Sequence, residues 1–395
     1  MHIALCTPVS IDLFDNLVEH HAPLIKGYTY PFAFFLASRL LERQHIVTVV
    51  TTAFDAQQKM EWWSSDKRLH VIAVPRRRPR FTCLDAYRRE VRAMRHELRR
   101  CRPDIVHAQW TYEFADAGLS SGFPCLVTAR DAPWIVARQF RAIYRLYRAI
   151  YESLWVTPRI SYMTSVSAHI DSVFQKEPFL RPAKTWVVPN GIDEQFVAKK
   201  PKPCVANPLA PVFFDLSTWN DLKNPIPLLQ AFQRVRSVLP MARLCVIGLL
   251  TGGRTPQERY AIRNNLLEGV ELLGSMSNLE LLHFLEDQVD IVVHTTKEES
   301  FSMISLESMA KGIPVIGGKK SGAVPFVLGG GKAGILVNIQ SPLEIAEAML
   351  RLVNDTTLYE QTATQALARV RECFLLDKVV TDYEQIYYEM LKNER

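Results

Sequence analysis

The chain of 395 residues lacks the features that mark membrane-spanning and disulfide-bonded proteins. No apolar run approaches the roughly 18 residues that a bilayer span needs, and the longest candidate, residues 31–41, is interrupted by Ser38 and Arg39. The seven cysteines include no C-x-x-C pair and no paired His ligands, which indicates reduced thiols and argues against a structural zinc site. There is also no internal repeat and no low-complexity tract.

The first residues lack the basic and apolar regions of a signal peptide, because Met1 runs directly into residues 2–6, which have the pattern of a first strand. We therefore expect a cytoplasmic protein. A hydrophobic content of 48% with 22% charged residues is ordinary for a folded chain. The length exceeds what one core normally holds and suits two domains.

Short apolar strands alternate with segments of helical periodicity along the whole chain. This alternation predicts an α/β protein with two doubly wound parallel sheets, each covered by helices on both faces. The predicted strands in the first half are residues 46–51, 69–74, 104–108, 125–128 and 185–189, and those in the second half are 212–216, 243–248, 289–294 and 313–316. The sequence VPNGID at 188–193, followed by lysines and prolines at 199–203, predicts the change of domain.

Two carboxylates eight positions apart, Glu299 and Glu307, stand where a loop is expected to turn into a helix. The helix is predicted to begin at residue 302 or 303 and to end at Gly312, a residue suited to a helix C-terminus. A helix N-terminus offers unsatisfied backbone N–H groups and a positive dipole end, which suit a diphosphate. The two carboxylates can accept hydrogen bonds from sugar and ribose hydroxyls.

This stretch resembles the C-terminal signature of the retaining glycosyltransferases of family 4. The shared pattern is a Glu, seven residues, a second Glu, a helix of small residues, Gly-x-Pro-Val at 312–315 and a glycine-rich turn. Further stretches recur in the order of that family: residues 188–193, 222–224, 228–232, 246–248, Gly274 and 279–281. The resemblance covers most of the chain and is strongest in the second half.

The resemblance implies the B-type glycosyltransferase fold, in which two Rossmann-like domains face a cleft. We predict an acceptor-side domain at 1–195, a linker at 196–211 and a nucleotide-sugar domain at 212–376. Residues 377–395 resemble the closing helix that in such enzymes crosses back onto the first domain.

The same resemblance implies roles for individual residues. Glu299 would contact hydroxyls of the transferred sugar, Glu307 the ribose, and Lys223 the diphosphate. Backbone N–H groups of the loop would add donors, and Gly27 would let the first domain's backbone approach the phosphates; a surface lysine and a simple turn are the plainer alternatives for Lys223 and Gly27. The loop residues concerned are Ser300, Phe301, Ser302 and Met303. No metal and no cofactor is expected, because this family stabilises the leaving group with cations and backbone dipoles.

Several positions depart from the family pattern. Thr128-Ala129-Arg130 stands where the family usually has Thr-x-His, and residues 217–220 lack the usual arginine before the lysine. Arg130 could supply that missing charge as a catalytic-site residue, bind an anionic acceptor, or pair with Asp131 or another carboxylate. His107, with Gln109 in place of a second His, is a candidate catalytic residue or a structural one. Phe326 replaces the usual Glu after a proline, so the contact at that point must differ.

Basic residues are concentrated in the first half of the chain. Residues 1–195 hold 26 Lys and Arg against 19 Asp and Glu, an excess of +7, whereas the remainder carries −1. Two predicted helices pair an apolar seam with a basic stripe, the second running over 136–154. The first seam comprises Leu84, Tyr87, Val91, Met94, Leu98 and Cys101 beside Arg88, Arg92, Arg95, Arg99 and Arg102; the second comprises Val136, Phe140, Ile143, Tyr147, Ile150 and Leu154 beside Arg138, Arg141, Arg145 and Arg148.

The ordinary interpretation of each helix is a buried apolar face with arginines in water. Several basic clusters in one domain favour in addition an acceptor or anionic membrane surface, with the protein peripheral at the inner face of a membrane. Nucleic acid is not expected, because no recognition motif accompanies the charge. The residues assigned to this surface are Arg76, Arg77, Arg78, Arg80, Arg141 and Arg145.

The sequence thus predicts a retaining, metal-independent glycosyltransferase. It would transfer a hexose or related sugar from a UDP, GDP or similar nucleotide sugar to a glycan or glycolipid in polysaccharide or lipopolysaccharide-type biosynthesis. Two alternatives stay open. One is a nucleotide-sugar epimerase or hydrolase of the same architecture, and the other is a non-catalytic scaffold that keeps the fold. The base, the sugar, the acceptor and the linkage are not determined by the sequence.

Overall fold

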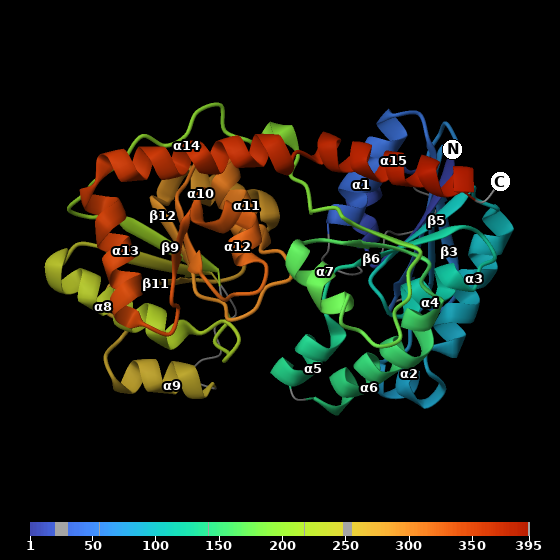
Figure 1. Ribbon diagram of the computed structural model, residues 1–395, viewed down its shortest axis with the longest axis horizontal. Helices are drawn as coiled ribbons and strands as arrows, with labels where there is room; N and C mark the ends of the chain where they lie inside the picture. The colour runs from blue at the N-terminus through green and yellow to red at the C-terminus, as the bar shows by residue number, and fades with distance from the viewer. Residues whose placement is uncertain (20–30, 55, 141, 217, 248–254, 394–395) are drawn as a thin grey trace. The chain divides into compact units, whose positions relative to one another are not determined.

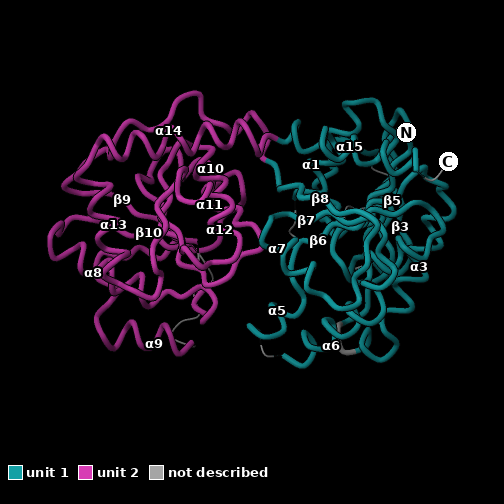
Figure 2. Tube along the Cα trace, viewed as in Figure 1, with its two compact units in different colours: residues 1–191, 376–395 teal, residues 192–375 magenta. Residues whose placement is uncertain are grey.

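The computed structural model describes residues 1–19, 31–54, 56–140, 142–216, 218–247 and 255–393. The chain forms two compact units, shown in Figure 2. Unit 1 comprises residues 1–191 and 376–395, and unit 2 comprises residues 192–375. Each unit is a sheet flanked by helices (Figure 1).

Unit 1 contains an eight-stranded sheet in the order β3-β4-β2-β1-β5-β6-β7-β8. All neighbouring strands are parallel except β3, which pairs antiparallel with β4 at one edge. The predicted strands are all present, but the four-residue strands β3 and β7 were not predicted. The strands are β1 (His2–Cys6), β2 (Ile46–Ala53), β3 (Met60–Trp63), β4 (Leu69–Pro75), β5 (Ile105–Gln109), β6 (Cys125–Ala129), β7 (Tyr162–Ser165) and β8 (Lys184–Val187).

Strand alternation sends side chains to opposite faces of this sheet. Ile3 and Leu5 belong to the core cluster formed with α1 (Phe32–Glu42) and α15 (Leu376–Asn393), whereas Cys6 contacts Met94 on the other face. The remaining helical elements of unit 1 are η1 (Ile11–Leu17), α2 (Pro79–Thr82), η2 (Cys83–Asp85), α3 (Arg88–Cys101), α4 (Glu113–Leu119), α5 (Pro133–Phe140), α6 (Ile143–Tyr151), η3 (Glu152–Val156), η4 (Thr157–Arg159) and α7 (Ala168–Phe174).

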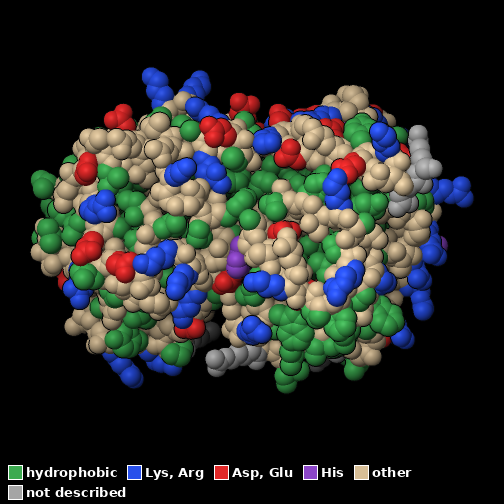
Figure 3. Space-filling view, in the orientation of Figure 1, with side chains coloured by type: hydrophobic (Ala, Val, Ile, Leu, Met, Phe, Trp, Pro, Cys, Tyr) green, Lys and Arg blue, Asp and Glu red, His purple; other side chains and the backbone are tan. Residues whose placement is uncertain are grey.

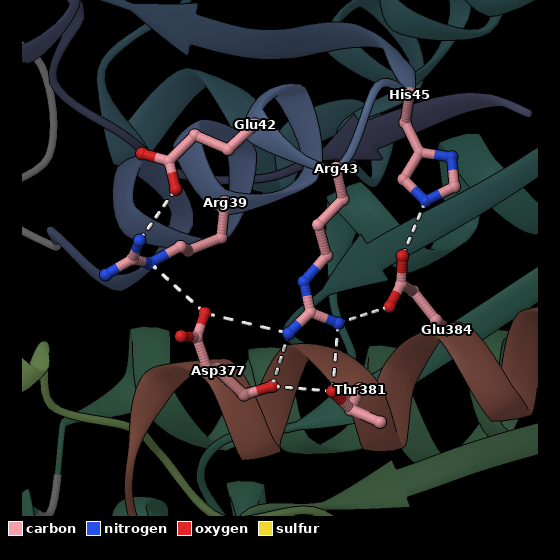
Figure 4. Close-up of polar contacts among 7 residues, drawn as sticks. All are labelled: Arg39, Glu42, Arg43, His45, Asp377, Thr381 and Glu384. Carbon is pink, nitrogen blue, oxygen red and sulfur yellow. Dashed lines mark hydrogen bonds and ion pairs between the residues drawn. The ribbon is translucent and has the colours of Figure 1, made fainter.

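The C-terminal helix α15 is part of unit 1 and packs against α1 near the chain's start. Its buried apolar residues join the unit 1 core, and polar contacts at its beginning hold it to α1 (Figure 4). Arg43 donates to Glu384 at 2.5 Å and to the carbonyl of Asp377 at 2.8 Å. His45 lies 2.6 Å from the other oxygen of Glu384. The end of the chain therefore completes the core of its first half.

Unit 2 contains a six-stranded parallel sheet in the order β11-β10-β9-β12-β13-β14. Phe213 packs on Phe232 on one face of β9, and Phe214 packs on Phe284 on the other. The strands are β9 (Val212–Leu216), β10 (Arg243–Ile247), β11 (Val270–Leu273), β12 (Ile291–His294), β13 (Val315–Gly318) and β14 (Ile335–Val337), of which β11 and β14 were not predicted. The helical elements are η5 (Glu194–Phe196), α8 (Pro225–Val238), α9 (Pro256–Arg263), α10 (Asn278–Gln288), α11 (Met303–Ala310), α12 (Val324–Val327), η6 (Gly329–Gly331), α13 (Pro342–Asn354) and α14 (Thr356–Cys373).

The second basic helix predicted from the sequence is wrong in two respects. Helix α5 ends at Phe140 and α6 begins at Ile143, so the segment is not one helix, and it continues as a π-helical turn, η3. The predicted faces are also inverted on α6. Its buried residues are Arg148, Ala149 and Tyr151, whereas Ile143 on the apolar seam is 88% exposed. In α3, by contrast, Val91, Met94 and Leu98 are buried as predicted, but the helix begins only at Arg88, and Leu84 of the predicted seam lies in η2 and is 82% exposed.

Candidate functional site

The loops that follow β9 and β12 bring Lys223 and Glu299 together in unit 2. The Lys223 ammonium donates to Glu299 Oε1 at 2.8 Å. Both loops are held in place by the backbone, because the N–H of Lys297 donates to the carbonyl of Leu222 at 2.8 Å. This meeting of two residues 76 positions apart follows from the parallel sheet, in which the carboxyl ends of neighbouring strands lie at one edge.

The residues just before Lys223, where the family usually has an arginine, form a turn in this chain. Trp219 is 4% exposed and belongs to the unit 2 core. Asn220 accepts from the backbone N–H of Lys223 at 3.0 Å, so its side chain shapes the turn. Asn224 has a left-handed backbone with φ of 54°, and Pro225 then begins α8. These residues position Lys223 and add no second cation.

His294 is a third member of this cluster that the sequence reasoning missed. It ends the buried strand β12, and its Nε2 lies 3.3 Å from Glu299 Oε1. Neither ring nitrogen has a hydrogen-bond partner within the described part of the chain, so the contact is an ion pair when the imidazole is protonated. The signal that could have found it is a polar residue at the end of an apolar strand, the same signal that singled out His107.

Glu299 is held in its ionised form. Burial favours the neutral acid, but the neighbouring His294 and Lys223 outweigh burial and lower the pKa of Glu299 to about 2. Its side chain keeps 21% of its exposure, so it remains reachable from solvent. A carboxylate with this pKa accepts hydrogen bonds and does not act as a proton donor near neutral pH.

Glu307 lies on α11 and has the opposite electrostatic character. It is 7% exposed, and its Oε1 accepts from Asn278 at the start of α10 at 2.9 Å. Burial, with only this neutral partner to oppose it, raises the pKa of Glu307 to about 7. The helix ends as predicted, with Gly312 in the left-handed region at φ of 65° just after the C-cap Lys311.

The N-terminus of α11 has no side-chain cap. Ser302 is the N-cap, with φ of 79° and no side-chain cap bond, because its hydroxyl is bonded to that of Ser305 at 2.7 Å. The N–H of Leu306 makes the first bond back to Ser302, at 3.3 Å. In any α-helix the first N–H groups have no carbonyl partner one turn earlier in the same helix, which is the general condition for anion binding.

Phe301 points into a cluster of aromatic rings beneath the loop. Its ring lies 5.6 Å from that of Phe374 and 6.5 Å from that of Phe326, and Phe301 is 3% exposed. Arg369 donates to the carbonyls of Phe326 and Val327 at 2.6 and 2.8 Å. Phe326, which stands where the family usually has a Glu, thus anchors the loop by packing. Ser300 also lies in this loop, before the helix.

Arg130 and His107 belong to a buried hydrogen-bonded chain in unit 1. Arg130 donates to the amide oxygens of Gln109 and Asn190 and lies 4.3 Å from the ring centroid of Phe32. Asn190 is part of the VPNGID stretch, so one residue of that motif is the hydrogen-bond acceptor for Arg130. The predicted pairing with Asp131 is absent among the described residues, since the Asp131 carboxylate accepts only from Tyr112, at 3.4 Å.

His107 is saturated by neighbours in the core. Its Nδ1 lies 2.6 Å from the Tyr387 hydroxyl, and its Nε2 lies 2.6 Å from Thr128 Oγ1 and 3.2 Å from Gln109 Nε2. Because the Gln109 oxygen accepts from Arg130, its NH₂ donates to His107 Nε2, and the imidazole proton is then on Nδ1. Burial, with Arg130 nearby, lowers the pKa of His107 well below its usual value. These contacts give His107 a structural place, and it has no part in the mechanism below.

The remaining predicted positions are Gly27 and the arginines assigned to an acceptor or membrane surface. Gly27 and Arg141 lie outside the described residues. The Arg76 guanidinium is buried 3.3 Å from Glu113, and Arg77 pairs with Asp85 and Glu90 at 2.8 and 2.6 Å, so neither presents a free charge. Arg78 is exposed, and Arg80 lies in α2. The described residues include no group of three or more His, Cys, Asp or Glu suited to a metal ion.

Two family models match the chain on either side of the domain change. Residues 32–196 match "Glycosyltransferase Family 4", and residues 205–369 match "Glycosyl transferases group 1". The chain belongs to the family 4, group 1 glycosyltransferases. The second match contains the Lys223, Glu299 and Glu307 positions, and the first contains Arg130.

Relatives of this glycosyltransferase include the N-acetyl-alpha-D-glucosaminyl L-malate synthase of Bacillus anthracis, 27% identical over 185 residues. That match covers 47% of this chain and 47% of the relative, so the chain spans about half the length of that relative. Among solved structures, the sucrose-phosphate synthase of Thermosynechococcus elongatus has a TM-score of 0.76 and 16% identity over 100% of both chains. Anabaena HepE in complex with UDP-glucose has a TM-score of 0.69 and 17% identity, again over 100% of both chains. These likenesses show the B-type glycosyltransferase fold.

Proposed function

We propose that the protein is a retaining glycosyltransferase that moves a hexose from a nucleoside-diphosphate sugar, in the first instance UDP-glucose, to a glycan or glycolipid acceptor. The observation that carries the proposal is the cluster of Lys223, Glu299 and His294 close to the N-terminus of α11. A cation, an ionised carboxylate and the positive end of a helix dipole are what a sugar diphosphate needs. UDP-glucose is the first donor to test because a structural relative binds it.

In this mechanism Lys223 and the first amides of α11 hold the diphosphate. Glu299 accepts hydrogen bonds from hydroxyls of the sugar, and Glu307 accepts from the ribose. The bond between the anomeric carbon and the diphosphate oxygen breaks as the acceptor oxygen forms its bond on the same face of the sugar. The acceptor proton passes to the departing phosphate, so the negative charge that develops there lies beside the Lys223 ammonium.

The experiment is a thermal-shift panel of UDP, GDP and ADP with their common sugars, on the wild type and on Glu307→Ala. A ligand at a hundred times its dissociation constant stabilises the native state by about 2.7 kcal/mol, which gives a measurable rise in Tm. We expect one base to shift the wild type and to lose most of that shift in Glu307→Ala. The control is Glu347→Ala, which removes an exposed carboxylate on α13 of the same unit.

No shift with any nucleotide would contradict the proposed donor site and favour a non-catalytic scaffold. An equal shift in Glu307→Ala would remove Glu307 from the donor site. Donor binding followed by sugar release without an acceptor would instead favour a hydrolase. The loss of the family's His and Arg is the specific observation behind the scaffold alternative. Product analysis by NMR of the anomeric proton then tests retention.

A further inference from the structure

Unit 1 carries an apolar ridge on its surface where α5, α6 and η3 follow one another. All members of the ridge are strongly exposed, from 42% for Ile150 to 88% for Ile143. Hydrophobic side chains gather over this part of the surface in Figure 3, with Lys and Arg side chains nearby. We define the apolar ridge as Phe140, Ile143, Leu146, Ile150, Leu154 and Trp155.

The ridge faces outward because the opposite side of α6 is fixed to the rest of the unit by polar contacts. Arg148 is buried, with its guanidinium 3.5 Å from the ring centroid of Tyr112 and 3.6 Å from Glu113. Tyr151 is 6% exposed and donates to Asp116. Tyr144, on the same side, accepts from Tyr87 at 2.8 Å. Helix α6 therefore buries an arginine and exposes isoleucine and leucine, and an exposed apolar face of this kind marks an interaction surface.

A pocket of about 460 Å³ lies beside the ridge, between α3 and the α6–η3 segment. Ile150, Leu154 and Trp155 of the ridge line one side of it, and Val91 contributes from α3. Arg88, Arg92, Arg95 and Arg159 line it as well. Asp116 lines it too and pairs with Arg159 at 2.9 Å. The size of the pocket is in the range of small-molecule sites, and Arg88, Arg92 and Arg95 give its apolar wall a cationic rim.

Three arginines of this rim have their charge available. Arg88 and Arg92 are exposed, Arg95 is half-buried, and none of the three forms an ion pair with another described residue. Arg76 and Arg77 differ, because each forms an ion pair with a carboxylate of unit 1. Arg88, Arg92 and Arg95 follow one another at helical spacing on one side of α3. We call these three residues the basic rim.

We propose that the apolar ridge and the basic rim form a docking surface for an anionic lipid bilayer. Charge complementarity selects this occupant: arginines next to exposed apolar side chains match a phosphate layer above a hydrocarbon layer. Apolar side chains insert below the headgroups, and the basic rim contacts the phosphates. None of the described helices is both long and apolar enough to cross a membrane, so attachment is at the surface. The docking surface is independent of sugar transfer and goes beyond the proposed function.

The test is vesicle flotation of the whole protein, without donor or acceptor. We expect binding to vesicles of phosphatidylcholine with phosphatidylglycerol and little binding to phosphatidylcholine alone. The double variant Ile143→Ser/Leu154→Ser and the double variant Arg92→Glu/Arg95→Glu should each weaken partitioning about tenfold or more, because each removes one of the two attractions. Added salt should release the protein in part.

Matched controls lie in unit 2. Leu209 is 71% exposed and Arg234 is exposed, so Leu209→Ser and Arg234→Glu make the same types of substitution elsewhere on the surface and should leave partitioning unchanged. The melting temperature of each variant shows whether it is folded. Equal partitioning of ridge variants and controls, or no binding of the wild type to anionic vesicles, would overturn the proposal. Sedimentation equilibrium gives a further test. A wild-type dimer that dissociates in Ile143→Ser/Leu154→Ser would also overturn the proposal, because a second copy of the chain would then cover the ridge.

Trp155 offers a direct reading of insertion, because it is 57% exposed and lies on the ridge. Vesicles containing brominated phosphatidylcholine and phosphatidylglycerol should quench its fluorescence. Trp155→Leu should keep vesicle binding and lose that quenching. Binding without any difference in quenching between the two proteins would place the contact elsewhere and contradict the proposal.

Discussion

Glu299 and Glu307 differ in protonation because they have different neighbours. Glu299 has Lys223 and His294 beside it and stays ionised, whereas Glu307 has one amide partner in a buried place and a pKa of about 7. Opposite environments for two carboxylates indicate separate duties. Glu299 suits a permanent acceptor of hydroxyl hydrogen bonds, and Glu307 titrates in the neutral range.

Replacement of Glu299 by Gln should lower kcat/KM at least tenfold, about 1.4 kcal/mol, because the sugar hydroxyls lose an ionised acceptor and Lys223 loses its partner. Steady-state kinetics with the donor from the thermal-shift panel measures this. Asp221→Asn is the control, since Asp221 pairs with Lys297 in the same pair of loops but is 84% exposed. Near-normal turnover of Glu299→Gln would remove Glu299 from the mechanism.

Nucleotide binding should depend on pH through Glu307. Its folded pKa is raised above the usual 4.5 to about 7, so the native state binds more protons than the unfolded state between these values. The contribution of Glu307 to stability is therefore largest at low pH and falls as pH rises through this window. A bound ribose favours the ionised acceptor, so the nucleotide Kd should decrease as pH rises from about one unit below 7 to one above.

Glu307→Gln should flatten both dependences, because the amide does not titrate. Calorimetry of nucleotide binding across this pH range measures the first, and denaturant unfolding of the unliganded protein measures the second. A Kd that changes equally with pH in both proteins would assign the titration to another group.

At the residue scale, the sequence predicted the site residues that belong to the family motifs, and it missed residues that join the site only through their contacts in the folded structure. Lys223 and Glu299 were both singled out, and the structure brings them into contact. His294 was overlooked although it ends an apolar strand, and Asn278 was not singled out because it becomes relevant only through its contact with Glu307. The roles given to the predicted site residues remain predictions.

Helical elements show where sequence periodicity succeeds and where it fails. Apolar spacing on α3 gave the buried face correctly, because the arginines there remain outside. The same rule failed on α6, because Arg148 is buried in contact with Glu113 and Tyr112, and the apolar seam of the helix is therefore exposed. Periodicity reports that a helix is amphipathic, and only tertiary partners decide which face is buried.

The aromatic cluster under the donor loop can be tested at the level of the element. Phe374 is fully buried against Phe301 and Phe326, so Phe374→Ala should destabilise the protein by about 3 kcal/mol or more. Because Phe301 leads directly into α11, the nucleotide Kd should also rise. Phe374→Leu keeps most of the volume and serves as the control. Equal nucleotide affinity in Phe374→Ala would mean that the cluster does not position the loop.

On the scale of the whole molecule, both sheets and most strands could be predicted, because parallel strands buried on two faces leave short, nearly continuous apolar runs in the sequence. The division of the structure follows contacts that sequence alone does not contain. Unit 1 is made of two segments, and its second segment, residues 376–395, begins immediately after unit 2 ends. The predicted domain boundaries stay predictions.

The attachment of α15 can be measured through Glu384. Its carboxylate bonds both Arg43 and His45, so Glu384→Ala should lower the free energy of unfolding by about 1–3 kcal/mol. Glu389→Ala is a matched control on the same helix, because Glu389 makes a surface pair with Lys184 and should cost less than about 1 kcal/mol. Denaturant unfolding compares them. Equal costs would mean that the Arg43–Glu384–His45 contacts add nothing to the docking of α15.

Helix α15 also has a consequence for the order of events during synthesis. Residues 1–191 leave the ribosome long before the helix that covers part of their core exists. At about 5–20 residues per second, translation of residues 192–375 and of α15 takes on the order of 10 s or more, during which unit 1 is incomplete. A chain that stops before Leu376 therefore lacks the helix that covers part of the unit 1 core, and the apolar residues that α15 covers are exposed.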